Sequence, residues 1–278
     1  MANFGYHFSR WQGGWCRRLY QMLLPVIVRR PVPPPRSLDL EVFSYSGEHT
    51  VPEQVASVRS FLRHAGRPKS FTIVSDGTHT RRSIRLLERI DSSIRVRPST
   101  TPAADLPEKL REYLLNHPTG KQLALLMSLP ESGPALYFDS DVLFFDHAGD
   151  LEGAAAKNNL PAWYLADCQF SGDRRILNDR LEERQPVNTG VLLLFRKLDW
   201  SLAIDRFLKL DGAPDFFTNQ TMAHLVMHAA GARPLDPRKY VLQLDDQFVY
   251  ADRYASPNLV LRHYVNPVRH KFWTALIH

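Results

Sequence analysis

The order of apolar and polar positions along the chain predicts strands and helices that alternate. Short runs rich in β-branched and aromatic residues are typical of buried strands, and they occur at residues 40–46, 71–75, 94–97 and 135–138. Between them, apolar residues recur at helical spacing over residues 52–64, 80–90, 106–115 and 121–129. This order predicts an α/β, Rossmann-like fold with a mixed, mainly parallel sheet flanked by helices. Ligands of such sheets bind beyond the carboxyl ends of the strands.

The second half of the chain continues the pattern with less regular spacing. Further strands are expected at residues 163–167, 191–195 and 260–264, and a helix is expected to start within residues 217–224. Polar residues stand where these elements begin or end, among them Asp167, Asn188 and His263. Gly190, two residues after Asn188, permits another part of the chain to approach closely.

The net basic charge of the protein is confined to its first 36 residues. They hold six arginines and no acidic residue, whereas the remaining 242 residues hold 29 charges of each sign, so the formal net charge is +6. The neutral body argues against a nucleic-acid ligand. We therefore assign residues 1–37 to a basic, proline-rich extension and linker, and residues 38–278 to a single domain.

The extension contains an apolar stretch, residues 19–28, that is flanked by arginine pairs and is too short to span a bilayer. Trp11 and Trp15 interleave with arginines, as in helices that lie in a membrane headgroup layer. The extension is expected either to contact an anionic membrane peripherally or to pack against the body of the protein. Cys16 and Cys168 form no disulfide framework. This indicates a cytoplasmic protein, with the inner membrane face as the place of any peripheral contact.

The most informative stretch is residues 135–145, in which two apolar runs flank Asp139 and Asp141. An unpaired carboxylate in a buried strand is costly, and a divalent cation offsets that cost. Oxygen ligands that lie one residue apart at a strand end suit Mn²⁺ or Mg²⁺, which keep open positions for substrate phosphates. The pattern predicts a metal–diphosphate site. The alternative is that both carboxylates cap backbone amides in a turn.

The presence or absence of other known motifs limits the classes of reaction that this chain could catalyse. The chain has no Gly-x-Gly-x-x-Gly sequence and no Walker loop, which argues against a nicotinamide or P-loop protein. A phosphatase of the haloacid-dehalogenase type is an alternative in which Asp139 is the nucleophile, Asp141 the acid, and Asp245 with Asp246 a late acidic pair. In that class the first motif normally lies on the first strand, whereas here a complete βαβαβ unit precedes it.

Five segments in order resemble the GT-A glycosyltransferases, most closely the family-eight retaining enzymes such as glycogenin and bacterial galactosyltransferases. They are the helix at residues 121–129 and the sequences YFDSDV, NTGVLLL, NQTMAHL and HYVNPVRHKFW. The resemblance implies a metal-dependent enzyme that moves a sugar from a nucleotide-diphosphate donor, such as a UDP-sugar, to an acceptor hydroxyl with retention. The acceptor would be a carbohydrate, a lipid-linked molecule or a protein. Residues 38–141 would form the nucleotide-binding half and residues 142–278 the acceptor half.

The resemblance also implies roles for individual residues. The residues that would hold Mn²⁺ or Mg²⁺ are Asp139, Asp141 and His263. The residues that would surround the transferred sugar and serve catalysis are Gln220, Asp167 and Asn188. The residues that would bind the donor are Tyr45 near the base, and Lys121, Asp139, Arg269 and Lys271 near the diphosphate. Because Gln220 is a poor nucleophile, front-face attack by the acceptor is expected, and Asp167 is the candidate carboxylate for a covalent intermediate.

Three departures from the family pattern bear on these roles. Lys121 stands nearest to the position of a family arginine, and Asn219 stands where the family often has aspartate. The C-terminal motif has Asn266 in place of glycine and reaches its Lys-x-Trp only with an insertion, so either Arg269 or Lys271 is expected to be the phosphate clamp. A non-catalytic protein that binds nucleotide sugars with the same fold therefore remains an alternative.

Overall fold

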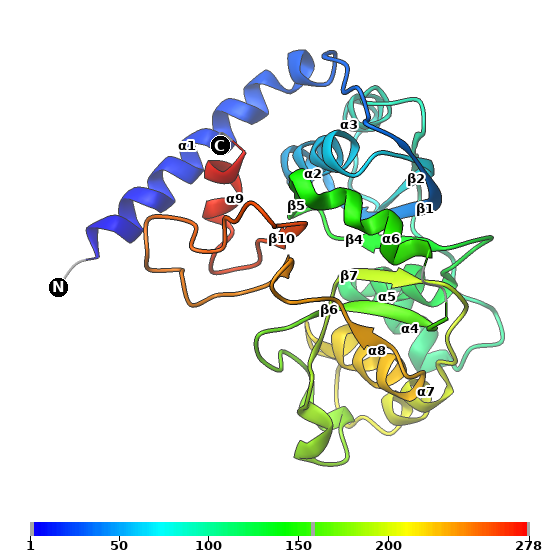
Figure 1. The fold of residues 1–278 in the computed structure, drawn as a ribbon. Coiled ribbons are helices and arrows are strands. Elements are labelled where there is room, and N and C mark those ends of the chain that lie inside the picture. Colours follow the sequence, from blue (N-terminus) through cyan, green and yellow to red (C-terminus); the bar gives the residue numbers. More distant parts are fainter. Residues whose placement is uncertain (1–2, 157–158, 277–278) are drawn as a thin grey trace.

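A central sheet organises the computed structural model, which describes residues 3–156 and 159–276. Within these residues seven strands form a sheet of order β3-β2-β1-β4-β7-β6-β8 (Figure 1). Their bounds are β1 Ser37–Ser46, β2 Arg67–Ser75, β3 Ile94–Arg97, β4 Ala135–Phe138, β6 Ala162–Ala166, β7 Val187–Leu194 and β8 Arg233–Pro234. The first four strands run parallel, whereas β7 is antiparallel to both of its neighbours. The predicted mixed, mainly parallel sheet is confirmed.

Helices cover both faces of this sheet (Figure 1). One face carries α2 (Val51–His64), α3 (Arg81–Glu88) and α6 (Asp150–Ala156). The other carries α4 (Glu108–Asn116), α5 (Pro118–Ser128), α7 (Ser201–Leu208) and α8 (Thr218–Ala229). The sequence pattern predicts α2 to α5 and α8 to within a few residues, but it does not predict α6 or α7.

A second, three-stranded sheet brings the C-terminal part of the chain back to the end of β4. It consists of β5 (Val142–Phe144), β10 (Leu261–His263) and β9 (Tyr240–Val241). β10 runs antiparallel to β5, with His263 opposite Val142. This pairing carries His263 to the turn that follows β4. The short helix α9 (His270–Ala275) comes next and ends the described chain.

The N-terminal extension forms one long helix, α1 (Phe4–Ile27), where the sequence marks no more than a ten-residue apolar stretch. α1 lies alongside α9 (Figure 1). The contact is close because a Cβ added to Gly13 would lie 2.4 Å from the carbonyl oxygen of His270. Arg17 also pairs with Glu53 of α2, Nε to Oε1, at 2.5 Å. The extension therefore packs on the body of the protein along one side.

Within residues 3–156 and 159–276 no helix combines the length and the apolar content needed to cross a bilayer.

Candidate active site

Asp139 and Asp141 lie in the turn that joins β4 to β5, at the carboxyl end of β4. The backbone N–H of Asp139 donates to the carbonyl of Gly190 on β7 at 2.9 Å. The backbone N–H of Tyr264, just after β10, donates to the carbonyl of Asp141 at 2.9 Å. The turn is thus fixed between the large sheet and the small one.

His263 completes the group. Its Nε2 lies 3.0 Å from Oδ1 of Asp141 and 3.7 Å from Oδ2 of Asp139. One ligand atom from each of the three residues lies within 4.8 Å of the others. Two carboxylates and an imidazole fit a divalent cation such as Mn²⁺. The structure therefore brings together the three residues that the sequence names as metal ligands.

Each charge of this group shifts the pKa values of its neighbours. Burial alone would raise the pKa of Asp141, but the positive charges of His263 and Arg269 outweigh it and hold that pKa well below its usual range. At Asp139 burial dominates and, with the nearby Asp141 charge, raises the pKa to about 6. Burial would lower the pKa of His263, yet the two carboxylates raise it. A cation bound here would neutralise both carboxylates at once.

Asn188 and Gly190 set the orientation of the His263 ring. Oδ1 of Asn188 accepts from the Gly190 N–H at 2.8 Å and lies 3.0 Å from Nδ1 of His263. Because that oxygen is an acceptor, Nδ1 carries the proton, and Nε2 points at the carboxylates. A Cβ on Gly190 would lie 2.0 Å from Cε1 of His263. Only a glycine leaves room for the imidazole.

Arg269 and Lys271, the two candidates for the phosphate clamp, occupy different surroundings. Arg269 is 44% exposed, and its Nη2 lies 2.5 Å from Oδ2 of Asp141. Lys271 is fully buried, and its Nζ donates to Oδ2 of Asp246 and to the carbonyls of Val249 and Ala251. Its three donors are all used inside the protein. The structure therefore places Arg269 at the metal group and Lys271 in a structural cluster.

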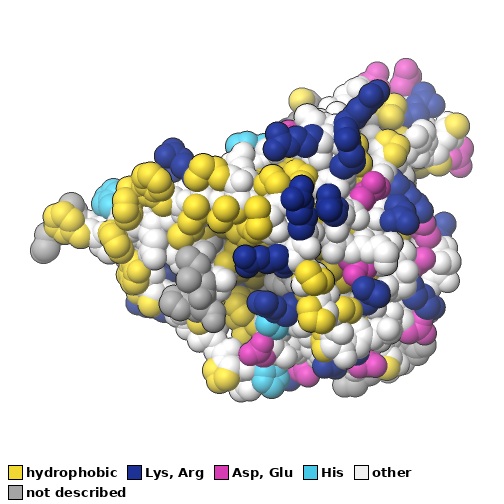
Figure 2. All heavy atoms as spheres, turned by 90° about the horizontal axis from the view of Figure 1, so that it is seen from above, with side chains coloured by type: hydrophobic (Ala, Val, Ile, Leu, Met, Phe, Trp, Pro, Cys, Tyr) yellow, Lys and Arg dark blue, Asp and Glu magenta, His cyan; other side chains and the backbone are white. Residues whose placement is uncertain are grey.

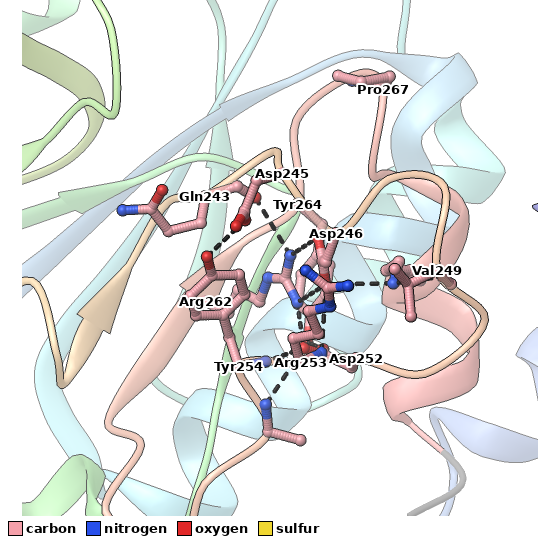
Figure 3. Close-up of polar contacts among 12 residues, drawn as sticks. Gln243, Asp245, Asp246, Val249, Asp252, Arg253, Tyr254, Arg262, Tyr264 and Pro267 are labelled. Atoms are coloured by element: carbon pink, nitrogen blue, oxygen red, sulfur yellow. Dashed lines mark hydrogen bonds and ion pairs between the residues drawn. The ribbon is translucent and has the colours of Figure 1, made fainter.

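That cluster is centred on Arg262, which precedes His263 (Figure 3). The Arg262 guanidinium bonds to Asp246 and Asp252 and lies against the rings of Tyr254 and Tyr264, 5.0 and 4.9 Å from their centroids. Asp246 is itself fully buried. Since its carboxylate is bonded to Arg262 and Lys271, it is not free to act as the late acidic residue of a phosphatase. The cluster instead ties the loop before β10 to the strand that bears His263.

Asp167, Asn188 and Gln220 lie together next to the metal group. Oδ2 of Asp167 accepts from Nδ2 of Asn188 at 3.1 Å and from Nε2 of Gln220 at 3.2 Å. Gln220 also donates to the carbonyl of Ser171 at 2.6 Å. Asn188 belongs to both groups, because it holds His263 through its oxygen and Asp167 through its nitrogen. The three residues expected around the transferred sugar are thus neighbours.

Gln122 on α5 is a site residue that the sequence analysis overlooks. Its Nε2 donates to Oδ1 of Asp139 at 2.9 Å and to the hydroxyl of Tyr137 at 2.7 Å, and its Oε1 accepts from Asn219. The neighbouring Lys121 does not contact Asp139 but donates to the carbonyl of Asp76 at 3.0 Å. A neutral amide in a helix carries no charge signature. The one signal in the sequence is that Gln122 directly follows Lys121 in the predicted helix at residues 121–129.

The carboxyl ends of β1 and β2 carry polar groups without partners. The hydroxyls of Tyr45 and Ser46 and both ring nitrogens of His79 are buried and bond to no other atom of the described chain. Burial, together with the charge of Asp76, raises the pKa of Tyr45. Buried polar atoms are nearly always hydrogen-bonded in a complete site. These groups are therefore suited to receive a polar ligand.

Comparison with solved structures shows that the chain shares its fold with known glycosyltransferases. No family model and no curated protein matches the chain. Among solved structures, the galactosyltransferase LgtC, in complex with donor and acceptor sugar analogues, is 16% identical with a TM-score of 0.57, covering 85% of this chain and 94% of its own. Mouse xyloside xylosyltransferase 1 is 13% identical with a TM-score of 0.53, covering 84% and 99%. The glycosyltransferase GlyE of Streptococcus pneumoniae is 13% identical with a TM-score of 0.52, covering 87% and 60%.

These similarities confirm the GT-A glycosyltransferase fold that the sequence motifs predict. At identities this low the fold is shared, and the chemistry has to be argued from the residues of this chain.

Proposed function

We propose that the protein is a metal-dependent glycosyltransferase that moves a sugar from a nucleoside-diphosphate donor to an acceptor hydroxyl. The observation that carries this proposal is the group of Asp139, Asp141 and His263 at the carboxyl end of β4 in a GT-A fold. Ligands of such sheets bind at this edge. The phosphatase alternative lacks support, because Asp246 is enclosed by Arg262 and Lys271.

The donor would lie across the edge of the sheet. Asp139, Asp141 and His263 would hold Mn²⁺ or Mg²⁺, which would supply positive charge to the diphosphate. Arg269 would release Asp141 to the metal and turn to the phosphates, because its side chain is 44% exposed and its guanidinium already reaches the metal group. The unpartnered Tyr45 hydroxyl would face the nucleoside, for which uridine is our candidate, and Lys121 would add positive charge near the diphosphate.

The transfer breaks the bond between the anomeric carbon and the diphosphate oxygen and forms a bond from that carbon to the acceptor oxygen. The acceptor proton passes to the departing phosphate oxygen, so charge and atoms balance. Asp167 is held by Asn188 and Gln220 through the same oxygen, which makes it a weaker nucleophile and favours front-face attack with retention. Gln220 and Asn188 then position the sugar next to the leaving group.

A thermal-stability screen tests donor binding. Nucleoside diphosphates at a hundred times their Kd should stabilise the protein by about 2.7 kcal/mol when Mn²⁺ is present and much less with EDTA. Absence of stabilisation by every diphosphate would contradict the proposal. Release of free sugar from a stabilising nucleotide sugar distinguishes an enzyme from a non-catalytic binding protein.

A further inference from the structure

α1 presents an apolar stripe to the surroundings along its whole length. Large side chains between 44% and 82% exposed form it: Phe4, Phe8, Trp11, Trp15, Leu19, Met22, Leu23 and Val26. At 3.6 residues per turn, their spacing places them within an arc of about 120° around the helix. Figure 2 shows hydrophobic side chains gathered in this way, with Lys and Arg side chains beside them. Exposed apolar patches of this extent mark interaction surfaces.

The stripe belongs to a fixed surface rather than to a loose tail. α1 packs on α9 through its other side, where Gly13 lies against the backbone of His270. Two aromatic residues from the loop before β10 extend the stripe. Phe248 and Tyr250 are 54% and 47% exposed, and the ring of Tyr250 lies 5.7 Å from that of Phe8. Segments distant in the sequence thus build one apolar face.

Basic residues border this apolar face at one edge and in an adjacent groove. Arg18 borders the stripe on α1 and Arg29 follows the end of the helix, both are exposed, and residues 1–36 contain no acidic residue. A groove between α1 and α2, about 550 Å³ in volume, is lined by apolar side chains and by Arg30, Arg59, Arg63 and His64. Its one carboxylate, Asp146, lies 3.0 Å from Nδ1 of His64. In the described part of the chain no carboxylate pairs with the three arginines of the groove.

We infer that this face docks on the surface of an anionic lipid bilayer, with the apolar stripe in the headgroup layer and the arginines at lipid phosphates. Tryptophans flanked by basic residues are typical of helices that lie in this layer. Each basic residue near an anionic surface strengthens binding about fivefold. A second copy of the chain fits poorly, because pairing two stripes would bring arginines of like charge together.

Docking would place the candidate active site beside the membrane. Gly13 of α1 lies against the backbone of His270, the residue that follows Arg269 of the metal group. α1 therefore packs directly on the segment that carries Arg269. This consequence rests on the proposed function. Together, the proposed function and the docking indicate that the acceptor is anchored in the membrane.

Flotation of the full chain with vesicles tests the docking. The wild type should float with phosphatidylglycerol-containing vesicles and not with pure phosphatidylcholine vesicles at the same salt. The double variant Trp11→Ser/Trp15→Ser should lose at least tenfold in partitioning, and Arg18→Gln/Arg29→Gln about 25-fold. Leu181→Ser is the matched control, since Leu181 is 62% exposed on a different segment and should not affect flotation.

Several outcomes would overturn the inference. These are a wild type that ignores anionic vesicles, a tryptophan variant that floats as well as the wild type, or a wild-type dimer that becomes monomeric in that variant without any vesicle binding. Melting temperatures of the variants should match the wild type, because the substituted side chains are exposed. Stabilisation by nucleoside diphosphates without vesicles tests the proposed function separately. Failure of the vesicle experiment therefore leaves the proposed function intact, and failure of the diphosphate experiment leaves the docking intact.

Discussion

Nε2 of His263 lies 3.0 Å from Oδ1 of Asp141, although 122 residues separate them in the sequence. The contact depends on the antiparallel pairing of β10 with β5, which sets His263 opposite Val142. The buried ion cluster around Arg262 holds β10 in place from the other side. The candidate metal site is therefore a product of the tertiary fold rather than of one local motif.

Gly190→Ala should damage this contact. The added methyl would lie 2.0 Å from the His263 ring, so the imidazole must move. We expect Mn²⁺ affinity to fall at least tenfold and stability to fall by about 1–3 kcal/mol. Calorimetric titration with Mn²⁺ and urea unfolding measure both. Gly133→Ala, where a methyl meets no atom within 4 Å, should change neither.

Gln122→Met should weaken metal binding without removing a ligand. Gln122 orients Asp139 through a hydrogen bond of 2.9 Å, and loss of such a supporting contact typically costs about 10–100-fold in metal affinity. Lys121→Gln, one residue earlier, should leave Mn²⁺ affinity unchanged but weaken nucleotide binding. Equal metal affinity in the Gln122→Met variant and the wild type would refute the role of Gln122.

Arg269 and Lys271 should respond to substitution in opposite ways. Arg269→Ala should weaken diphosphate binding by about 1.5–3 kcal/mol with little effect on stability. Lys271→Met should leave the buried carboxylate of Asp246 and two backbone carbonyls without their donor and destabilise the fold by about 3–5 kcal/mol. Urea unfolding and diphosphate titration of both variants show which of the two residues binds the diphosphate and which stabilises the fold. A stable Lys271→Met variant with weakened diphosphate binding would reverse our assignment.

Acid should destabilise the protein through Asp246. Although burial opposes it, bonding to Arg262 and Lys271 lowers the pKa of Asp246 in the folded state. A carboxylate with a depressed folded pKa contributes stability above its unfolded pKa of about 3.9, and that stability is lost as pH falls through the folded value. Urea unfolding from pH 6 to pH 3 should show this loss. Asp246→Asn should be less stable at pH 6 but should depend less on pH below 4.

The sequence predicts most of this fold because the spacing of apolar residues within each segment distinguishes strands from helices. β3 and β4 occur at the predicted residues, and Asp139 with Asp141 stands out because two carboxylates interrupt an apolar run. Metal ligands of this kind violate the surrounding hydrophobic pattern and are therefore visible in the sequence. The grouping of His263 with them was reached through resemblance, since a histidine in a strand carries no signal of its partners.

Other parts required the tertiary structure. Lys271 and Arg269 are equivalent as sequence signals, and only the burial of one and the exposure of the other separates them. Gln122 acts through a neutral hydrogen bond and leaves no pattern. α1 was recognised as basic and apolar, but its division into a packed side and an exposed stripe depends on contacts with α9.

The most direct test of the central claim is the release of sugar from nucleotide sugars, measured for the wild type and for Asp141→Asn with Mn²⁺ or with EDTA. We expect turnover of at least one nucleotide sugar by the wild type, its abolition by EDTA, and a loss of about a hundredfold or more in Asp141→Asn with the melting temperature retained. Turnover that survives EDTA or the Asp141→Asn substitution, or no turnover of any nucleotide sugar by the wild type, would contradict the central claim.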